Sequence, residues 1–223
     1  MPEFDIQYPH GNATRIVTPG SRSIRSQMIA FELGKEYYDG SRENGYGGYR
    51  YDGRWKKMLP NIIDRYQLNE SSSVLDLGCK KGFFMHDLNE MLPGIKIKGV
   101  ENHCYPIDHS MPSIKNHITL AEYDNLPYED GEFDFIFGFA AIYMMNLQGV
   151  MGSLREIQRV GKGNSFITLG AYRTKEELEL FQEWTLLGTK ILHVDEWLEV
   201  FEYTGYTGDY QFVTAETLHL VKG

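Results

Sequence analysis

The chain has 223 residues, of which 42% are hydrophobic and 24% are charged, and its formal net charge at pH 7 is −9. This length and composition predict one globular domain with embellishments. The acidic balance excludes a broad basic face for a phosphate backbone, which argues against a nucleic-acid partner.

The sequence contains no apolar stretch long enough to cross a bilayer, and the polar residues 1–5 do not resemble the core of a signal peptide. We therefore expect a cytoplasmic protein without a membrane partner. The two cysteines, Cys79 and Cys104, argue for reduced thiols rather than a disulfide framework.

Residues 1–54 carry no recognised motif and are expected to form an N-terminal extension or lid ahead of a domain at residues 55–223. Residues 23–35 are predicted to include a helix. Tyrosines alternate with glycines in residues 37–55, so this segment is either a packed surface loop or an aromatic cover over an active site. In the second case the candidate residues for contacting a substrate are Tyr37, Tyr46, Tyr49, Tyr51 and Arg54.

The most informative stretch is an apolar run that ends in a glycine-bearing turn and leads into a helical pattern, SVLDLGCKKGFF at residues 73–84. Its valine and leucines predict a buried strand. Gly78 and Gly82 bracket a turn in which the backbone bends sharply or approaches a ligand. A strand, a glycine loop and a helix in this order form a nucleotide-type site at the carboxyl end of a parallel strand.

Acidic residues follow this motif at informative distances. A second strand-like run ends at Glu101, 25 residues after Asp76, where a carboxylate can accept hydrogen bonds from both hydroxyls of a ribose. A third stretch, residues 121–137, places a short acidic loop before another strand. The spacing indicates a ligand that contains a nucleoside.

These motifs resemble those of class I S-adenosylmethionine-dependent methyltransferases of the small-molecule, type 11-like group, which read LDLGCGxG, an acid after strand two, and GDAxxLPFxDxxFD. The resemblance covers about residues 73–171 and includes LREIQRV at residues 154–160, although GKGN follows where the family usually has Pro-Gly-Gly. It implies an α/β fold with a doubly wound, Rossmann-like sheet of seven strands, of which only the last is antiparallel.

The resemblance also implies S-adenosylmethionine as the cofactor and S-adenosylhomocysteine as its product. The implied cofactor contacts are Asp76, Gly78 and Cys79 at the methionine end, Glu101 with Asn102 beside it at the ribose, Glu122 and Tyr123 at the adenine, and Phe139 with Ala140 over the sulfonium. One position departs from the family, since Lys80 stands where a glycine is usual. Its side chain must point away from the cofactor, or the loop must follow a different path.

After residue 94 short strands alternate with helices, as a doubly wound sheet requires. Strands are predicted near residues 73–78, 96–101, 117–121, 133–139 and 164–170. Helices are predicted near residues 55–66, 82–92, 105–114, 149–160, 174–187 and 195–204. Asp195 is expected to cap the last helix and Gly205 to end it, and a closing hairpin is predicted within residues 210–221.

Two other groups of residues invite a chemical role. His103, Cys104, Asp108 and His109 look superficially like metal ligands, but zinc sites usually have tighter paired spacings, so we interpret them as a helix start and predict no metal. Tyr143 follows the fourth strand and is a candidate to orient an acceptor or take its proton. A tyrosine among methionines is more often a core residue, so this role is the weaker interpretation.

The resemblance implies transfer of a methyl group to oxygen or nitrogen of a small polar metabolite, such as a natural-product or sugar derivative. Positioning supplies most of the rate gain in such a transfer, so a catalytic base is weakly marked. A non-catalytic, regulatory protein that binds S-adenosylmethionine with the same fold is the alternative. A flavin or nicotinamide oxidoreductase fits less well because residues 78–82 lack the G-x-G-x-x-G pattern.

Overall fold

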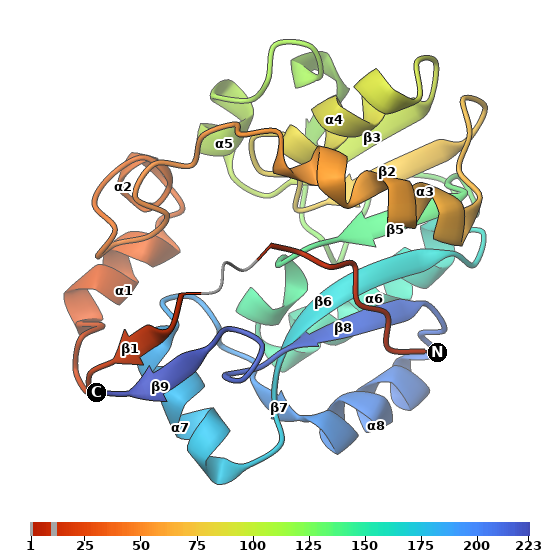
Figure 1. Ribbon diagram of the computed structural model, residues 1–223. Helices are drawn as coiled ribbons and strands as arrows, with labels where there is room; N and C mark the ends of the chain where they lie inside the picture. The colour runs from red at the N-terminus through yellow and green to blue at the C-terminus, as the bar shows by residue number, and fades with distance from the viewer. Residues whose placement is uncertain (1, 10–12) are drawn as a thin grey trace.

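A parallel sheet forms the centre of the molecule (Figure 1). The computed structural model describes residues 2–9 and 13–223, and within these ranges seven strands follow the order β4-β3-β2-β5-β6-β7, with β8 paired to β6. The strands are β2 (Ser73–Leu77), β3 (Lys96–Glu101), β4 (Ile118–Leu120), β5 (Phe135–Gly138), β6 (Ser165–Tyr172), β7 (Leu192–His193) and β8 (Asp209–Val213). The predicted seven-stranded, Rossmann-like α/β fold is confirmed.

The prediction that the last strand is antiparallel is wrong. Strand β8 runs parallel to β6, from Asp209 opposite Phe166 to Val213 opposite Gly170. The chain reaches β8 through helix α8 (Val194–Thr204), and a crossover helix returns the chain in its original direction.

The predicted closing hairpin is also wrong. After β8, Thr214 and Thr217 exchange hydrogen bonds between their hydroxyls and their backbone amides, which folds the chain into a turn. The chain then enters β9 (Leu220–Lys222), which pairs in parallel with β1 (Arg15–Val17) to form a separate two-stranded sheet. The free edge of β8 is covered by the N-terminal segment, because Glu3 forms a parallel bridge with Tyr210.

Helices cover both faces of the sheet. Besides α8 they are α1 (Ile24–Phe31), α2 (Lys35–Tyr38), α3 (Leu59–Tyr66), α4 (Phe83–Met91), α5 (Cys104–Asp108), α6 (Leu147–Val160) and α7 (Lys175–Trp184). Helices α3 and α4 share a core cluster with Val74, and α6 and α8 share another with Leu75, so successive residues of β2 point to opposite faces. No helix in the described ranges is long and apolar enough to cross a membrane. The cytoplasmic location stays a prediction.

Four helices are shorter than predicted. The helix expected over residues 174–187 ends at Trp184, and the helix expected over residues 55–66 becomes α-helical only at Leu59, after a 3-10 turn at Arg54–Lys57. The helix expected over residues 23–35 is interrupted after α1, because Leu33 adopts a left-handed backbone with φ 48° and α2 begins after Gly34. The helix expected over residues 105–114 ends at Asp108. Pro112 lacks an amide hydrogen and disfavours helical backbone in the residue before it, so the helix does not continue.

The start of α8 differs from the prediction, whereas its end agrees with it. His193, and not Asp195, is the N-cap, and Glu196 completes a capping box with it. Gly205 follows the helix with φ 73°, the left-handed conformation that ends many helices.

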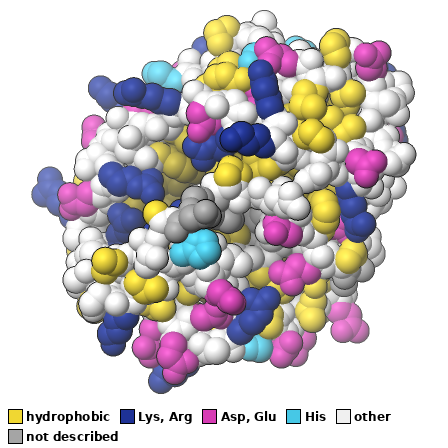
Figure 2. All heavy atoms as spheres, in the orientation of Figure 1, with side chains coloured by type: hydrophobic (Ala, Val, Ile, Leu, Met, Phe, Trp, Pro, Cys, Tyr) yellow, Lys and Arg dark blue, Asp and Glu magenta, His cyan; other side chains and the backbone are white. Residues whose placement is uncertain are grey.

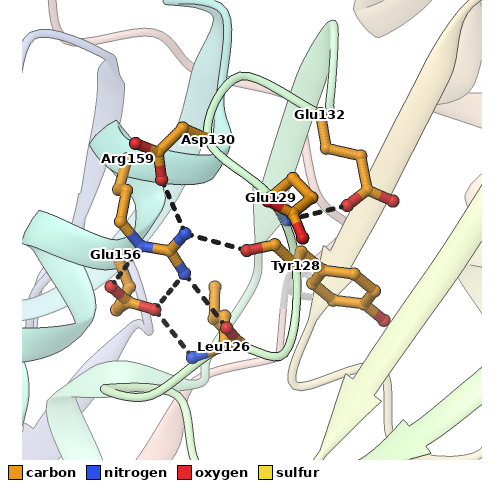
Figure 3. A network of polar contacts seen from close by, with 7 residues as sticks. All are labelled: Leu126, Tyr128, Glu129, Asp130, Glu132, Glu156 and Arg159. Carbon is orange, nitrogen blue, oxygen red and sulfur yellow. Dashed lines mark hydrogen bonds and ion pairs between the residues drawn. The ribbon is translucent and has the colours of Figure 1, made fainter.

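Arg159, near the end of α6, fixes the loop that precedes β5 (Figure 3). Its guanidinium donates to both Glu156 carboxylate oxygens at 2.7 Å, to the carbonyl oxygens of Leu126 (3.0 Å) and Tyr128 (2.8 Å), and to Asp130 Oδ1 (2.8 Å). Glu156 also accepts a hydrogen bond from the Leu126 amide at 2.7 Å. The arginine and the glutamate of the LREIQRV motif therefore hold a loop in place.

The Arg159→Lys variant is expected to lose about 1–3 kcal/mol of unfolding free energy. A single ammonium cannot reproduce the planar array of donors that serves two carboxylates and two carbonyls. Urea denaturation measures the loss, and hydrogen exchange in residues 126–131 is expected to become faster. Arg155→Lys, an exposed position on the same helix, is the control, and an equal loss in both variants would contradict this role.

Candidate active site

The loop between β2 and α4 has the geometry of a ligand-binding turn. Gly78 has φ 74° and Gly82 has φ 72°, so both adopt the left-handed backbone that favours glycine. A Cβ atom at Gly78 would lie 2.6 Å from the Cβ of Ala141, which leaves no room for a side chain. The Gly78 amide donates to the carbonyl oxygen of Val100 at 2.8 Å, which ties the loop to β3.

Lys80 keeps a left-handed backbone, with φ 53°, although it is not glycine. Its buried ammonium donates to the carbonyl oxygens of Gly78 (3.2 Å) and Phe139 (3.0 Å). The side chain does not point away from the predicted site. Lys80 lines both of two neighbouring cavities and therefore lies between them.

The smaller cavity, of about 180 Å³, contains the predicted ribose-binding acid. Glu101 is 2% exposed and accepts hydrogen bonds from the Lys80 amide (3.0 Å) and the Asn102 amide (3.1 Å). The Tyr123 hydroxyl lies 3.3 Å from Asn102 Oδ1 and 3.4 Å from Glu101 Oε1. Burial raises the pKa of Glu101, and the Lys80 ammonium partly offsets this effect. Glu101, Asn102 and Tyr123 thus form one polar wall.

The larger cavity, of about 330 Å³, contains the residues predicted at the methionine end of the cofactor. Its wall includes Asp76, Gly78, Cys79, Phe139, Ala140 and Tyr143. Burial raises the pKa of Asp76 to about 7, the Lys80 ammonium lowers it, and the Glu101 carboxylate raises it further. Burial also raises the pKa of the Tyr143 hydroxyl, which therefore stays protonated at neutral pH.

The raised pKa of Asp76 predicts a pH-dependent difference between the wild type and Asp76→Asn. The folded protein binds the Asp76 proton more tightly than the unfolded chain does. The protonated carboxyl therefore contributes fully to the free energy of unfolding below about pH 4, and this contribution is lost as pH rises through about 7. Asparagine does not ionise, so the free energy of unfolding of Asp76→Asn should not fall in this way. Relative to the wild type, we expect it to increase by about 1–4 kcal/mol between pH 5 and pH 8. Denaturant unfolding at both pH values measures it. The exposed Asp108→Asn variant is the control, and a pH-independent difference for Asp76→Asn would refute the prediction.

The remaining predicted site residues divide into two groups. Tyr37, Tyr46, Tyr49 and Arg54 all line the larger cavity. Glu122 is exposed and lines neither cavity. Tyr51 also lines neither cavity, because its ring packs against Phe83 and His86 of α4 and its hydroxyl donates to buried Asp87 at 2.6 Å. The structure therefore brings neither Glu122 nor Tyr51 to the site.

The tyrosine-glycine segment is both packed and positioned over the larger cavity. The Tyr46 and Tyr49 amides donate to the carbonyl oxygens of Tyr37 and Tyr38 at 2.9 Å and 2.8 Å. Asp39 anchors the segment, because the ammonium of Lys81 lies 2.7 Å from both carboxylate oxygens of Asp39. This ion pair connects the segment to the β2–α4 loop. We call residues 37–54 the cover.

Other residues that line the larger cavity were not predicted. They include three arginines, Arg15, Arg22 and Arg42, together with Tyr8 and Trp55. Six of the ten arginines of the chain fall in residues 1–54, and this concentration in an acidic protein is a signal that could have pointed to them. Their positions follow no periodic pattern, so the sequence does not show that they converge.

The residues that looked like metal ligands have structural roles. The His103 Nδ1 accepts a hydrogen bond from the Tyr105 amide at the start of α5, and His109 stacks on the ring of Tyr105. A different group, His86, Asp87 and Glu90, has potential ligand atoms within 4.8 Å of one another, but Glu90 is ion-paired with Lys56 at 2.7 Å. The absence of a metal stays a prediction.

Known proteins with similar sequences carry the same kind of domain. Residues 68–205 match a family model described as a methyltransferase domain. The chain is 28% identical over 172 residues to sterol 4-C-methyltransferase strm-1 of Caenorhabditis elegans, covering 72% of this chain and 48% of that protein. It is 27% identical over 156 residues to malonyl-[acyl-carrier protein] O-methyltransferase of Legionella pneumophila, covering 66% and 53%. The chain thus spans about half the length of these curated relatives.

Solved structures share the fold at low sequence identity. The YcgJ protein of Bacillus subtilis has a TM-score of 0.54 at 16% identity over 66% of each chain. The [4+2]-cyclase SpnF has a TM-score of 0.54 at 17% identity, covering 86% of this chain and 75% of that chain. With its glycine loop, its acid at the end of β3 and a matching domain over more than half its length, the chain belongs to the class I S-adenosylmethionine-dependent methyltransferases.

Proposed function

We propose that the protein transfers a methyl group from S-adenosylmethionine to oxygen or nitrogen of a small polar metabolite. The main observation is that Asp76 and Glu101 line two neighbouring cavities at the carboxyl ends of β2 and β3. This arrangement suits a ligand with a cationic amino-acid end and a ribose. The sterol and malonyl-[acyl-carrier protein] acceptors named for its relatives differ in chemistry, so they do not select an acceptor for this chain.

The side chains of the site fit this cofactor. The Glu101 carboxylate is suited to accept hydrogen bonds from the ribose hydroxyls, and Tyr123 offers a ring beside them. Asp76 and the carbonyl oxygens of Gly78 and Phe139 offer acceptors to an ammonium. Bound S-adenosylmethionine supplies a methyl group that its sulfonium makes electrophilic, so the chain mainly has to orient an acceptor and exclude water.

Tyr143 is proposed to orient the acceptor rather than to take its proton. Tyr143 lines the larger cavity, and the raised pKa of its hydroxyl leaves the proton in place at neutral pH. A protonated hydroxyl donates a hydrogen bond, which can fix an acceptor oxygen or nitrogen. A cavity of about 330 Å³ under the cover suits a small metabolite rather than a macromolecule.

Calorimetry is expected to show that S-adenosylmethionine and S-adenosylhomocysteine bind with micromolar affinity, whereas NAD does not bind. Glu101 at the end of β3 suits the ribose of the cofactor, and the loop at residues 78–82 lacks the glycine pattern that NAD requires. Binding of NAD without binding of S-adenosylmethionine would refute the assignment of the cofactor.

Incubation with methyl-labelled S-adenosylmethionine and fractionated cell metabolites tests the transfer itself. Label is expected in a small-molecule fraction, and heat-denatured protein is the control. Cofactor binding without label in any fraction would favour the alternative of a regulatory protein that only binds the cofactor. That alternative is considered because the fold also occurs in a protein described as a [4+2]-cyclase, so the fold alone does not establish the reaction.

A further inference from the structure

Positive charge is concentrated on one side of the larger cavity, although the chain as a whole carries a net charge of −9. Arg15 and Arg22 are half-buried in its wall, and Arg42 is exposed at its rim. Burial lowers the pKa of both Arg15 and Arg22, and the Arg42 guanidinium lowers both further, so Arg42 lies close enough to repel each of them. The Glu43 carboxylate offsets part of this effect at Arg22. Figure 2 shows dark blue side chains beside a hollow with hydrophobic side chains inside it.

Backbone carbonyl groups hold two of these arginines in position without neutralising them. Arg22 donates to the carbonyl oxygens of Trp184 (3.0 Å) and Glu43 (3.2 Å), and Arg42 donates to those of Gly45 (3.2 Å) and Tyr46 (3.0 Å). Within residues 2–9 and 13–223, neither arginine forms an ion pair with a carboxylate. Each guanidinium has five N–H donors, so donors remain for a ligand.

Arg54 shows what a neutralised arginine looks like in the same cavity. Its guanidinium pairs with both oxygens of Asp52, the shortest distance being 2.6 Å, and it also donates to the Tyr8 hydroxyl. Its charge is therefore already balanced within the protein. Arg22 and Arg42 differ from Arg54, because carbonyl oxygens orient their guanidinium groups without balancing the positive charge. The rest of the cavity wall is rich in aromatic side chains.

We infer that the methyl acceptor is an organic anion whose carboxylate or phosphate group binds Arg22 and Arg42, while its apolar part contacts the aromatic wall at Tyr46, Tyr49 and Phe139. Guanidinium groups match the planar and tetrahedral geometry of these anions, and the aromatic rings favour a ring or chain beside the charge. This inference rests on the proposed function, because it assigns the acceptor of the same site.

Phenyl phosphate, benzoate and the neutral benzyl alcohol are suitable probes, each titrated calorimetrically into the protein with and without saturating S-adenosylhomocysteine. Both anions are expected to bind at least tenfold more tightly than benzyl alcohol, and the tighter of the two identifies the preferred acid. Arg22→Gln and Arg42→Gln are each expected to weaken anion binding about tenfold. Arg42→Lys keeps the charge and should lose less. Arg155→Gln, exposed on α6, should bind the anions as the wild type does.

Equal affinity for anionic and neutral probes would overturn the inference, as would undetectable binding of both anions or full anion binding by both glutamine variants. Circular dichroism and thermal melts establish whether each variant is folded. If a glutamine variant is not folded, the anion affinity of Arg42→Lys is used to test the inference instead. Failure of S-adenosylhomocysteine to bind would instead overturn the proposed function. The titrations without S-adenosylhomocysteine measure the affinity for the anionic probes whether or not S-adenosylhomocysteine binds.

Discussion

Replacing Lys80 with glycine is expected to tighten the binding of S-adenosylhomocysteine tenfold or more. The Lys80 ammonium occupies the carbonyl oxygens of Gly78 and Phe139 and lies between the two cavities. A ligand that extends through both cavities must displace it. A hydrogen bond to a charged group is worth about 1.5–3 kcal/mol, and each 1.4 kcal/mol changes affinity tenfold. Glycine also adopts a φ of 53° without strain.

Calorimetry on wild type, Lys80→Gly and Lys80→Met separates the effect of charge from that of volume. Methionine keeps most of the side-chain volume but cannot donate to the two carbonyl groups. The affinity of Lys80→Met for S-adenosylhomocysteine is therefore expected to lie between those of the wild type and Lys80→Gly. Weaker binding by Lys80→Gly would contradict the displacement model. It would mean that the ammonium turns toward the carboxylate of the cofactor and contributes to binding.

Replacing Glu101 with glutamine is expected to weaken the binding of S-adenosylhomocysteine about tenfold to a hundredfold. The buried carboxylate accepts hydrogen bonds from two backbone amides, and a ribose in the smaller cavity would add donors to the same oxygens. A hydrogen bond to a charged acceptor contributes about 1.5–3 kcal/mol and one to a neutral acceptor about 0.5–1.5 kcal/mol, so removing the charge weakens each ribose bond by about 1 kcal/mol. The carboxamide keeps one acceptor oxygen and nearly the same shape, so the domain should stay folded.

Glu122→Gln makes the same chemical change on an exposed residue that lines neither cavity, and its affinity should equal that of the wild type. Thermal melts without ligand report any loss of fold in either variant. Unchanged affinity in Glu101→Gln would exclude Glu101 from the cofactor site and reduce it to a residue that braces the β2–α4 loop.

The sheet and the cofactor loop could be predicted because local sequence determines them. The apolar run before Gly78 can only be a buried strand, and the glycines at residues 78 and 82 occupy backbone conformations that other residues rarely adopt. Glu101 was found because its distance from Asp76 reflects one helix and one strand. The pattern of residues close in sequence was therefore sufficient to predict each of these features.

Features that depend on distant contacts could not be predicted. The pairing of β1 with β9 joins residues about 200 positions apart, and the parallel direction of β8 follows from a crossover that the strand pattern does not reveal. Tyr51 looked equivalent to its neighbouring tyrosines, but its hydroxyl meets buried Asp87 on α4. The sequence of the loop showed that Lys80 was unusual, but its side-chain direction depends on the carbonyl group of Phe139, which follows strand β5 and is distant in sequence.

The adjacent lysines of the β2–α4 loop have a consequence for how the binding of one ligand affects the binding of the other. Lys80 reaches the cofactor cavities, and Lys81 holds Asp39 of the cover, so one short turn of backbone contacts both. If displacement of Lys80 by the cofactor shifts this turn, thermodynamic linkage requires the cofactor and the acceptor to change each other's affinity by the same factor. Calorimetric titration of each ligand with and without the other measures this common factor, and Lys81→Met should make the two affinities independent.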